Sequence, residues 1–344
     1  MKSLIERLRT LLILGRVSNL PTVWSNLLAG WAIADIRPRM GMLQTGPDTT
    51  LWPMLSVLLG GSFLYIGGMY LNDYCDTAFD IRYCPGRPIP AGKISQRIVG
   101  LLAIFWFTSG FACFTSFGPM TIGVTLLLVG AIISYDFHHK NVVWAPLFMG
   151  FCRCLLYLLA ASAVEESWYF GPPYDNWWRG VLIYIRNDCW DAFLGTFQWI
   201  LPSAIPLGLY VAGISYLARC ESRPGKPTRW PFLLLLIAAI VLARSYGNFI
   251  GRFGWLLGQN PHEYLLFLGG LLVPCLFLPV WMAWLLIPFW RKTKPSIGRV
   301  VSGLLAGIVL LDMIVIAPQV GLYAVWLFPL FLLALLLQRI IPAT

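Results

Sequence analysis

The sequence predicts an all-α integral membrane protein with nine to ten transmembrane helices around a central cavity. Hydrophobic residues make up 58% of the 344-residue chain and charged residues only 12%, which is typical of a chain that lies mostly in a bilayer. The apolar residues form long runs, each near the roughly 20 residues that a helix needs to cross a membrane. Basic residues collect in alternate connections between these runs, as they do on one side of a membrane.

Ten apolar runs are expected to span the membrane. The fourth run is short and only Pro318-Gln319 separates the last two, so nine spans also fit the sequence. The N-terminal basic residues lead directly into the first run, so we expect no cleaved signal peptide. In chain order, the expected spans are Val17–Ile36, Pro53–Leu71, Ile98–Gly118, Thr121–Tyr135, Val142–Val164, Phe197–Ala218, Trp230–Tyr246, Leu265–Trp290, Ile297–Pro318 and Val320–Ile341.

The distribution of basic residues predicts the orientation. If the N-terminus is cytoplasmic, 18 of the 25 Lys and Arg residues fall on the cytoplasmic side of the ten-span arrangement. In a bacterium the membrane would be the inner one. Topology and contact with anionic lipid account for the formal charge of +10, so no nucleic-acid partner is implied.

We expect residues 1–344 to form one polytopic membrane domain with one insertion at about 165–195. This insertion is polar and rich in Trp, Tyr and Pro, so it is expected to lie along the outer interface of the membrane. Spans one to four and five to eight each carry a charged cytoplasmic connection after their second member. Two such repeats around one cavity would bring those connections together.

One segment at the end of the second span points to the chemistry. Asp73, Asp76 and Asp80 are spaced so that a continued helix places three carboxylates on one face. Their mutual repulsion favours a bound cation, and oxygen ligands that leave positions free suit Mg²⁺ held between the protein and a phosphate. Asn72 can add a neutral oxygen ligand or orient the other groups, and it is also expected to contact the substrate. The segment is therefore interpreted as a site for Mg²⁺ and a diphosphate.

The pattern Asn-Asp-x-x-Asp-x-x-x-Asp, followed by Arg87-Pro-x-x-x-Gly, resembles the first motif of the UbiA-type intramembrane prenyltransferases. The segment Arg16-Val-Ser-Asn19-Leu-Pro21 resembles the start of that family, and so does the pair Tyr135 and Lys140 after the fourth span. The resemblance implies an all-helical fold, a Mg²⁺-bound prenyl diphosphate donor, and transfer of the isoprenyl chain to a small aromatic or cyclic acceptor with release of diphosphate.

Roles follow from the chemistry of such a transfer. An allylic diphosphate ionises when its leaving group is neutralised, so metal ions and cationic side chains are needed around it. Arg87 and Lys140 are the expected diphosphate contacts, because both lie on cytoplasmic connections. Tyr135 and Tyr216 can shield the allylic cation with their rings, or they can simply pack against lipid or the protein core. Asn19 is added to the expected substrate contacts from the resemblance.

The second acidic motif of this family is reduced here. At the end of the sixth span the sequence contains Arg219 and Glu221, and Glu221 is the one acidic residue of the segment. Three interpretations stay open. Glu221 binds a metal with help from Ser222, Arg219 replaces that metal by direct contact with phosphate, or the segment forms a structural ion pair.

Two charged residues inside spans also leave alternatives. Arg153 can extend to the membrane surface or reach the cavity and bind substrate. Asp312 can serve function or bond neighbouring helices.

Two other classes were compared with the prenyltransferase interpretation. A CDP-alcohol phosphotransferase also carries helical aspartates, but only Asp76-x-x-x-Asp80 matches the end of its signature. A transporter or membrane scaffold would explain the spans and leave the three carboxylates unexplained. The identity of the acceptor, the chain length of the donor and the oligomeric state have no signature in the sequence.

Overall fold

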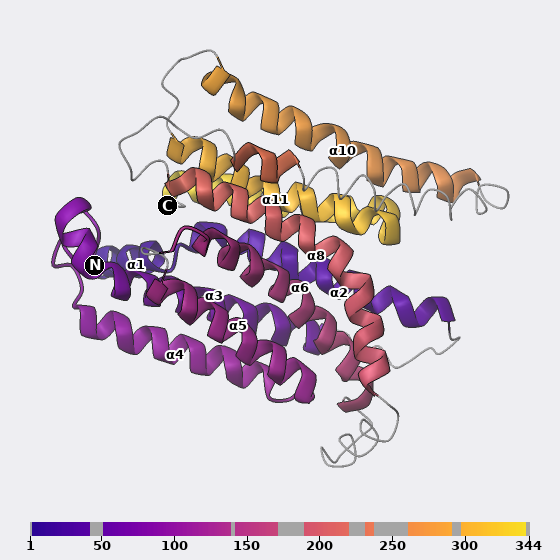
Figure 1. Cartoon of the computed structure of the whole chain (residues 1–344), viewed down its shortest axis with the longest axis horizontal. Coiled ribbons are helices and arrows are strands. Elements are labelled where there is room, and N and C mark those ends of the chain that lie inside the picture. The colour runs from indigo at the N-terminus through magenta and orange to yellow at the C-terminus, as the bar shows by residue number, and fades with distance from the viewer. Residues whose placement is uncertain are drawn as a thin grey trace.

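The protein is described by a computed structural model over residues 2–41, 51–138, 142–170, 189–219, 231–236, 261–290 and 297–341. Every regular element in these ranges is a helix, which confirms the predicted fold class. The helices pack side by side in one bundle, with α4 and α10 at opposite edges (Figure 1). In chain order they are α1 (Lys2–Leu14), η1 (Val17–Asn19), α2 (Leu20–Gly41), α3 (Leu51–Tyr83), α4 (Gln96–Phe114), α5 (Pro119–His138), α6 (Ala145–Phe170), α8 (Cys189–Arg219), α10 (Pro261–Trp290), α11 (Ile297–Val320), η3 (Gly321–Leu327) and α12 (Phe328–Ile340).

Seven helical segments of the described residues are long and apolar enough to cross a membrane. They correspond to the expected second to sixth, ninth and tenth spans. The fourth, short in the sequence, is the 20-residue helix α5. Gly321, the first residue of η3, separates the last two, because its left-handed backbone (φ 59°) ends α11 at Val320. Of the expected seventh span, only residues 231–236 lie in the described part of the chain.

Helix α2 differs from the spans around it. It covers most of the expected first span but is not among the seven apolar helices of the described residues, and its sequence includes polar residues such as Thr22, Ser25 and Asn26. All three side chains are fully buried, so they face other helices and not lipid. The chain before it is broken at Arg16, where α1 ends and η1 begins.

Burial separates the inner helices from the outer ones. In α11, 89% of the apolar segment is buried, whereas in α4 the buried share is 22%. The exposed face of α4 carries Leu101, Ile104 and Phe105, side chains that suit contact with lipid. Inner helices approach closely at small residues: a side chain on Gly150 of α6 would collide with the backbone of Gly208 of α8.

The predicted insertion at about 165–195 begins and ends in helix. Helix α6 continues to Phe170 and α8 begins at Cys189, so only residues 171–188 between them lie outside the described residues. Its interfacial position, and the single domain 1–344, stay predictions.

Candidate functional site

The acidic motif lies at the C-terminal end of α3. That helix continues past its apolar part to Tyr83, so Asp73, Asp76 and Asp80 do lie on one helix, as their spacing predicts. The three aspartates are buried, with 7%, 8% and 2% of their surface exposed. Three carboxylates that are this buried require nearby positive charge, since an unpaired buried charge is costly.

Arg87 supplies that charge. The chain leaves α3 through a turn in which Cys84 N–H donates to the carbonyl of Asp80 and Arg87 N–H donates to that of Cys84. This turn folds the Arg87 side chain back onto the helix that precedes it. Its Nη1 atom lies 2.8 Å from Asp80 Oδ2, 3.8 Å from Asp73 Oδ1 and 4.0 Å from Asp76 Oδ2.

The electrostatic environment keeps Arg87 charged. Burial alone would lower the pKa of its guanidinium, but the charges of Asp73 and Asp80 outweigh that effect and hold the pKa above its ordinary value. The predicted diphosphate contact is therefore a permanent cation at the centre of the acidic motif.

Arg16 is a second cation at this site. Its Nη2 atom lies 3.5 Å from Asp73 Oδ1 and donates to Asn72 Oδ1 at 3.3 Å. The backbone of Arg16 is left-handed (φ 41°, ψ 47°), an unfavourable conformation for a residue other than glycine. In the sequence, Arg16 belongs to the motif that resembles the family's start, but it was not predicted as a site residue.

Asp136 is a fourth carboxylate near the motif, and sequence reasoning missed it. Its Oδ1 accepts a hydrogen bond of 3.1 Å from Asn72 Nδ2, and the side chain is 4% exposed. The signal was present, because Asp136 follows Tyr135 in a pair that the resemblance already singled out. Asn72 thus joins Arg16 to Asp136 and, through them, the start of the chain to α5.

The donor atoms suit a hard cation such as Mg²⁺. In this structure, however, these oxygens surround a guanidinium and not a metal-sized space. Within the described ranges, no group of three or more His, Cys, Asp or Glu side chains is gathered closely enough to hold a metal ion. The three aspartates instead converge on one nitrogen of Arg87, which stands where a cation would be held. Asp73 Oδ1 is also buried without a hydrogen bond in the described residues. The carboxylate oxygens therefore fit Mg²⁺, provided that Arg87 moves aside.

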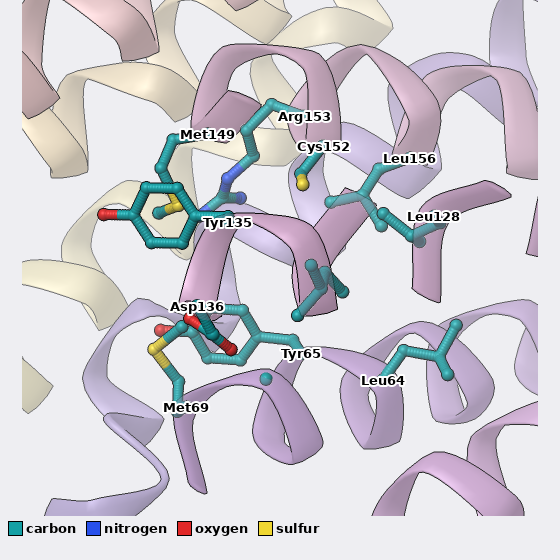
Figure 2. Close-up of a pocket in the computed structure, with 12 residues that line it drawn as sticks. Leu64, Tyr65, Met69, Leu128, Tyr135, Asp136, Met149, Cys152, Arg153 and Leu156 are labelled. Atoms are coloured by element: carbon teal, nitrogen blue, oxygen red, sulfur yellow. The ribbon is translucent and has the colours of Figure 1, made fainter. Parts of the chain in front are cut away.

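A pocket adjoins this cluster inside the bundle. Asp136, Tyr135 and Arg153 contribute polar groups to its wall, and apolar side chains such as Leu64 and Leu128 form the rest. Arg153 extends from α6 into this space, while Tyr65 and Met69 reach it from α3 (Figure 2). Because Asp136 contacts both Asn72 and the pocket, the charged cluster and the apolar space are neighbours.

The remaining predicted residues lie as follows. Asn19 is buried in η1, before α2. Arg219 ends α8, and its Nη1 donates to the carbonyls of Val142 and Val143 at 3.1 and 3.2 Å. Tyr216 is half-buried one turn earlier. Lys140 and Glu221 lie outside the described residues, so their roles stay predictions.

Comparison with known proteins decides the family. The sequence model of the UbiA prenyltransferase family matches residues 40–212. These 173 residues are just over half of the 344-residue chain. The chain belongs to the UbiA prenyltransferase family. The match includes the acidic motif of α3, its Arg87 turn and the pocket-lining helices α5 and α6.

Individual UbiA relatives are distant in sequence. The chain is 28% identical over 177 residues to the 4-hydroxybenzoate octaprenyltransferase of Aeromonas hydrophila, covering 51% of this chain and 55% of that protein. It is 24% identical over 226 residues to the digeranylgeranylglyceryl phosphate synthase of Methanopyrus kandleri, covering 62% and 83%. The match thus spans little more than half the length of the Aeromonas relative.

Solved structures share the fold. The apo structure of a UbiA homologue from Aeropyrum pernix superposes with a TM-score of 0.56 at 14% identity, covering 87% of this chain and 96% of that one. A solved digeranylgeranylglyceryl phosphate synthase gives a TM-score of 0.53, also at 14% identity, and covers 92% and 99%. At this identity the agreement concerns the arrangement of helices.

Proposed function

We propose that this protein transfers an isoprenyl chain from a prenyl diphosphate to a small acceptor, with release of diphosphate. The observation that carries the proposal is the convergence of three buried carboxylates on one cation, beside an apolar pocket. Such a pair of environments suits a substrate with a charged head and a hydrocarbon tail. The names of the relatives, which include an octaprenyltransferase and a digeranylgeranylglyceryl phosphate synthase, support the same class of reaction.

The metal would be held by Asp73, Asp76 and Asp80, with Asn72 as a further oxygen donor. A bound Mg²⁺ would neutralise charge on the departing diphosphate. Arg87 and Arg16 would bind phosphate oxygens, since both carry guanidinium groups that can bind them in pairs. Lys140 is proposed as a third phosphate contact from the sequence alone.

The pocket would receive the allylic end of the hydrocarbon chain together with the acceptor, and would shield the allylic carbon from water. Tyr135 lines it near Asp136, and its ring can stabilise positive charge that develops as the carbon–oxygen bond breaks. Tyr216 is proposed for the same role. Arg219 donates hydrogen bonds to backbone carbonyls, so we propose that it orders the connection between α5 and α6. Glu221 stays a candidate for a second metal ligand.

The orientation and side are also proposals. The basic residues favour a cytoplasmic N-terminus and a cytoplasmic diphosphate site, in the inner membrane if the organism is a bacterium.

The test is product formation by the full-length protein in lipid nanodiscs. The protein is incubated with geranylgeranyl diphosphate, 4-hydroxybenzoate and Mg²⁺, and products are identified by mass spectrometry. Asp73→Asn and Asp76→Asn should each lower turnover by roughly 100-fold or more, since weaker changes outside the ligand shell already cost about 10–100-fold. Glu6→Gln, an exposed residue of α1, is the matched control and should keep its activity.

Turnover of either aspartate variant within a few-fold of the wild type would remove the motif from the mechanism. If no product forms with this acceptor, binding of geranylgeranyl diphosphate is titrated with and without Mg²⁺. Binding that does not depend on Mg²⁺ would contradict the proposed site.

A further inference from the structure

Arg153 is a charged residue in the middle of a membrane-spanning helix. It lies on α6 within the apolar segment Ala145–Glu166, and only 8% of its surface is exposed. An arginine in this position is expensive unless its charge is compensated. Its side chain does not extend to the membrane surface, because Nη1 donates inward to Asn26 Oδ1 at 2.8 Å.

Asp312 compensates the charge of Arg153 through one intervening residue, Asn26. Asn26 uses its amide nitrogen to donate to Asp312 Oδ2 at 2.8 Å. Tyr157 donates to the other oxygen, Asp312 Oδ1, at 2.6 Å. Asn26, Tyr157 and Asp312 are all completely buried, so this chain of hydrogen bonds fixes α2, α6 and α11 together. It also fixes the amide of Asn26 and therefore the direction of the guanidinium.

The bond to Asn26 leaves most of the guanidinium available. A guanidinium has five N–H donors, and the hydrogen bond to Asn26 is the one that Arg153 makes within the described residues. Its carbon Cζ lies 5.9 Å from the centre of the Tyr65 ring, which stabilises the charge further without using a donor. Among the residues that line the pocket, Arg153 is the one cation.

We propose that Arg153 recognises an anionic substituent, such as a carboxylate, on the acceptor, and that Asp312 positions Arg153 through Asn26. This inference rests on the proposed function, because it assigns the acceptor to the pocket beside the acidic motif. The diphosphate has its own cations, Arg16 and Arg87, which contact Asp73. Among the described residues, Arg153 forms no ion pair or hydrogen bond with the three aspartates of the motif.

A purely structural role predicts a different geometry. If Arg153 served only to join helices, the shortest solution would be a direct ion pair with Asp312. Instead a neutral amide stands between them, and both oxygens of Asp312 accept hydrogen bonds from other residues. A carboxylate in the pocket would give Arg153 a direct anionic partner, and such charge-assisted bonds are strongest in water-poor surroundings.

The test compares two probes that differ by one charge. Binding of 4-hydroxybenzoate and of its neutral methyl ester is titrated against the full-length protein in nanodiscs. The wild type should bind the carboxylate at least tenfold more tightly than the ester, as expected for one charge-assisted contact. Arg153→Met should bring this ratio near one, and Arg153→Lys should keep part of it. Arg97→Met, an exposed arginine of α4, is the matched control and should keep the full ratio.

The positioning role has its own readout. Asp312→Asn keeps the size of the side chain but removes the charge, so the ratio should fall several-fold, whereas a merely structural defect would weaken both probes equally. Tyr157→Phe keeps the link from Asn26 to Asp312 and should retain most of the ratio. If Arg153→Met does not fold, the wild-type ratio together with Arg153→Lys and Asp312→Asn decides.

A wild-type ratio near one, or an unchanged ratio in folded Arg153→Met protein, overturns the inference. Binding of geranylgeranyl diphosphate with Mg²⁺ is measured on the same samples. A wild-type ratio near one with diphosphate binding intact rejects this inference alone. Absence of diphosphate binding in the wild type rejects the proposed function instead.

Discussion

At the scale of single residues, Arg87 forms ion pairs with three carboxylates from one position. A guanidinium and a hydrated divalent ion differ in shape and in the size of their charge, but both are cations that can pair with Asp73, Asp76 and Asp80. The side chain of Arg87 is 33% exposed, so it can move outward while the aspartates stay buried. The proposed function therefore predicts an exchange on substrate binding, in which Arg87 passes from carboxylate to phosphate.

This exchange predicts how metal should affect an Arg87→Ala variant. Without metal the variant should melt at a lower temperature than the wild type, because removal of one partner leaves buried charge unpaired. The cost should stay below the roughly 3–5 kcal/mol of a fully buried pair, since Arg87 is partly exposed. Added Mg²⁺ should raise the melting temperature of Arg87→Ala more than that of the wild type.

Thermal unfolding of both proteins across a series of Mg²⁺ concentrations measures the difference. Arg97→Ala, on the exposed surface of α4, should follow the wild type. Equal responses of Arg87→Ala and wild type to Mg²⁺ would mean that metal and guanidinium do not share the aspartates.

Arg16 combines an unfavourable backbone with a functional side chain. Its left-handed conformation costs roughly 1–2 kcal/mol for an ordinary residue and little for glycine. We therefore expect Arg16→Gly to be more stable than Arg16→Ala by about 1 kcal/mol. Both variants lack the guanidinium and should lose affinity for prenyl diphosphate to a similar degree, about tenfold.

Melting temperatures and titrations of geranylgeranyl diphosphate on the two variants separate these effects. If Arg16→Gly and Arg16→Ala were equally stable, the backbone at Arg16 would not be strained. Affinities that equal the wild type would exclude Arg16 from the phosphate site.

At the scale of elements, the end of α8 supports the connection between α5 and α6. Arg219 donates to the carbonyls of Val142 and Val143, and Ala145 N–H donates to Val142 as α6 begins. The connection belongs to the segment that carries Lys140 in the sequence. These hydrogen bonds therefore favour a role for Arg219 in positioning the α5–α6 connection, rather than in direct contact with phosphate.

We expect Arg219→Ala to loosen the start of α6. Loss of a hydrogen bond from a charged donor is worth roughly 1.5–3 kcal/mol, so amides of this segment, such as that of Ala145, should exchange about tenfold faster. Hydrogen exchange read by mass spectrometry measures this, with Arg97→Ala as the control. Unchanged exchange together with a tenfold loss of diphosphate affinity would instead favour the interpretation in which Arg219 binds phosphate.

At the scale of the whole molecule, the features that could be predicted from the sequence are those that depend on residues close together in the chain. The three aspartates share one face because helical spacing alone decides it, and the apolar spans follow from length and composition. Arg16 and Asp136 were not assigned to the site, since their approach to Asn72 depends on how α1 and α5 pack around α3. The partners of Asp312 were equally hidden, because they come from α2 and α6.

Orientation in the membrane is the property of the whole chain that the basic residues predict. Lys93 lies in the exposed turn after the acidic motif, and position 223 falls in the connection that follows the expected sixth span. Both should face the cytoplasm, while position 177 of the predicted insertion should face the opposite side, because Lys and Arg concentrate in cytoplasmic connections.

Single cysteines at positions 93, 177 and 223 are introduced after replacement of the eight native cysteines. Labelling with a membrane-impermeant maleimide, before and after the membrane is opened, should modify position 177 first and the other two only afterwards. If positions 177 and 223 react together, the arrangement of spans between them is not the one that the basic residues predict.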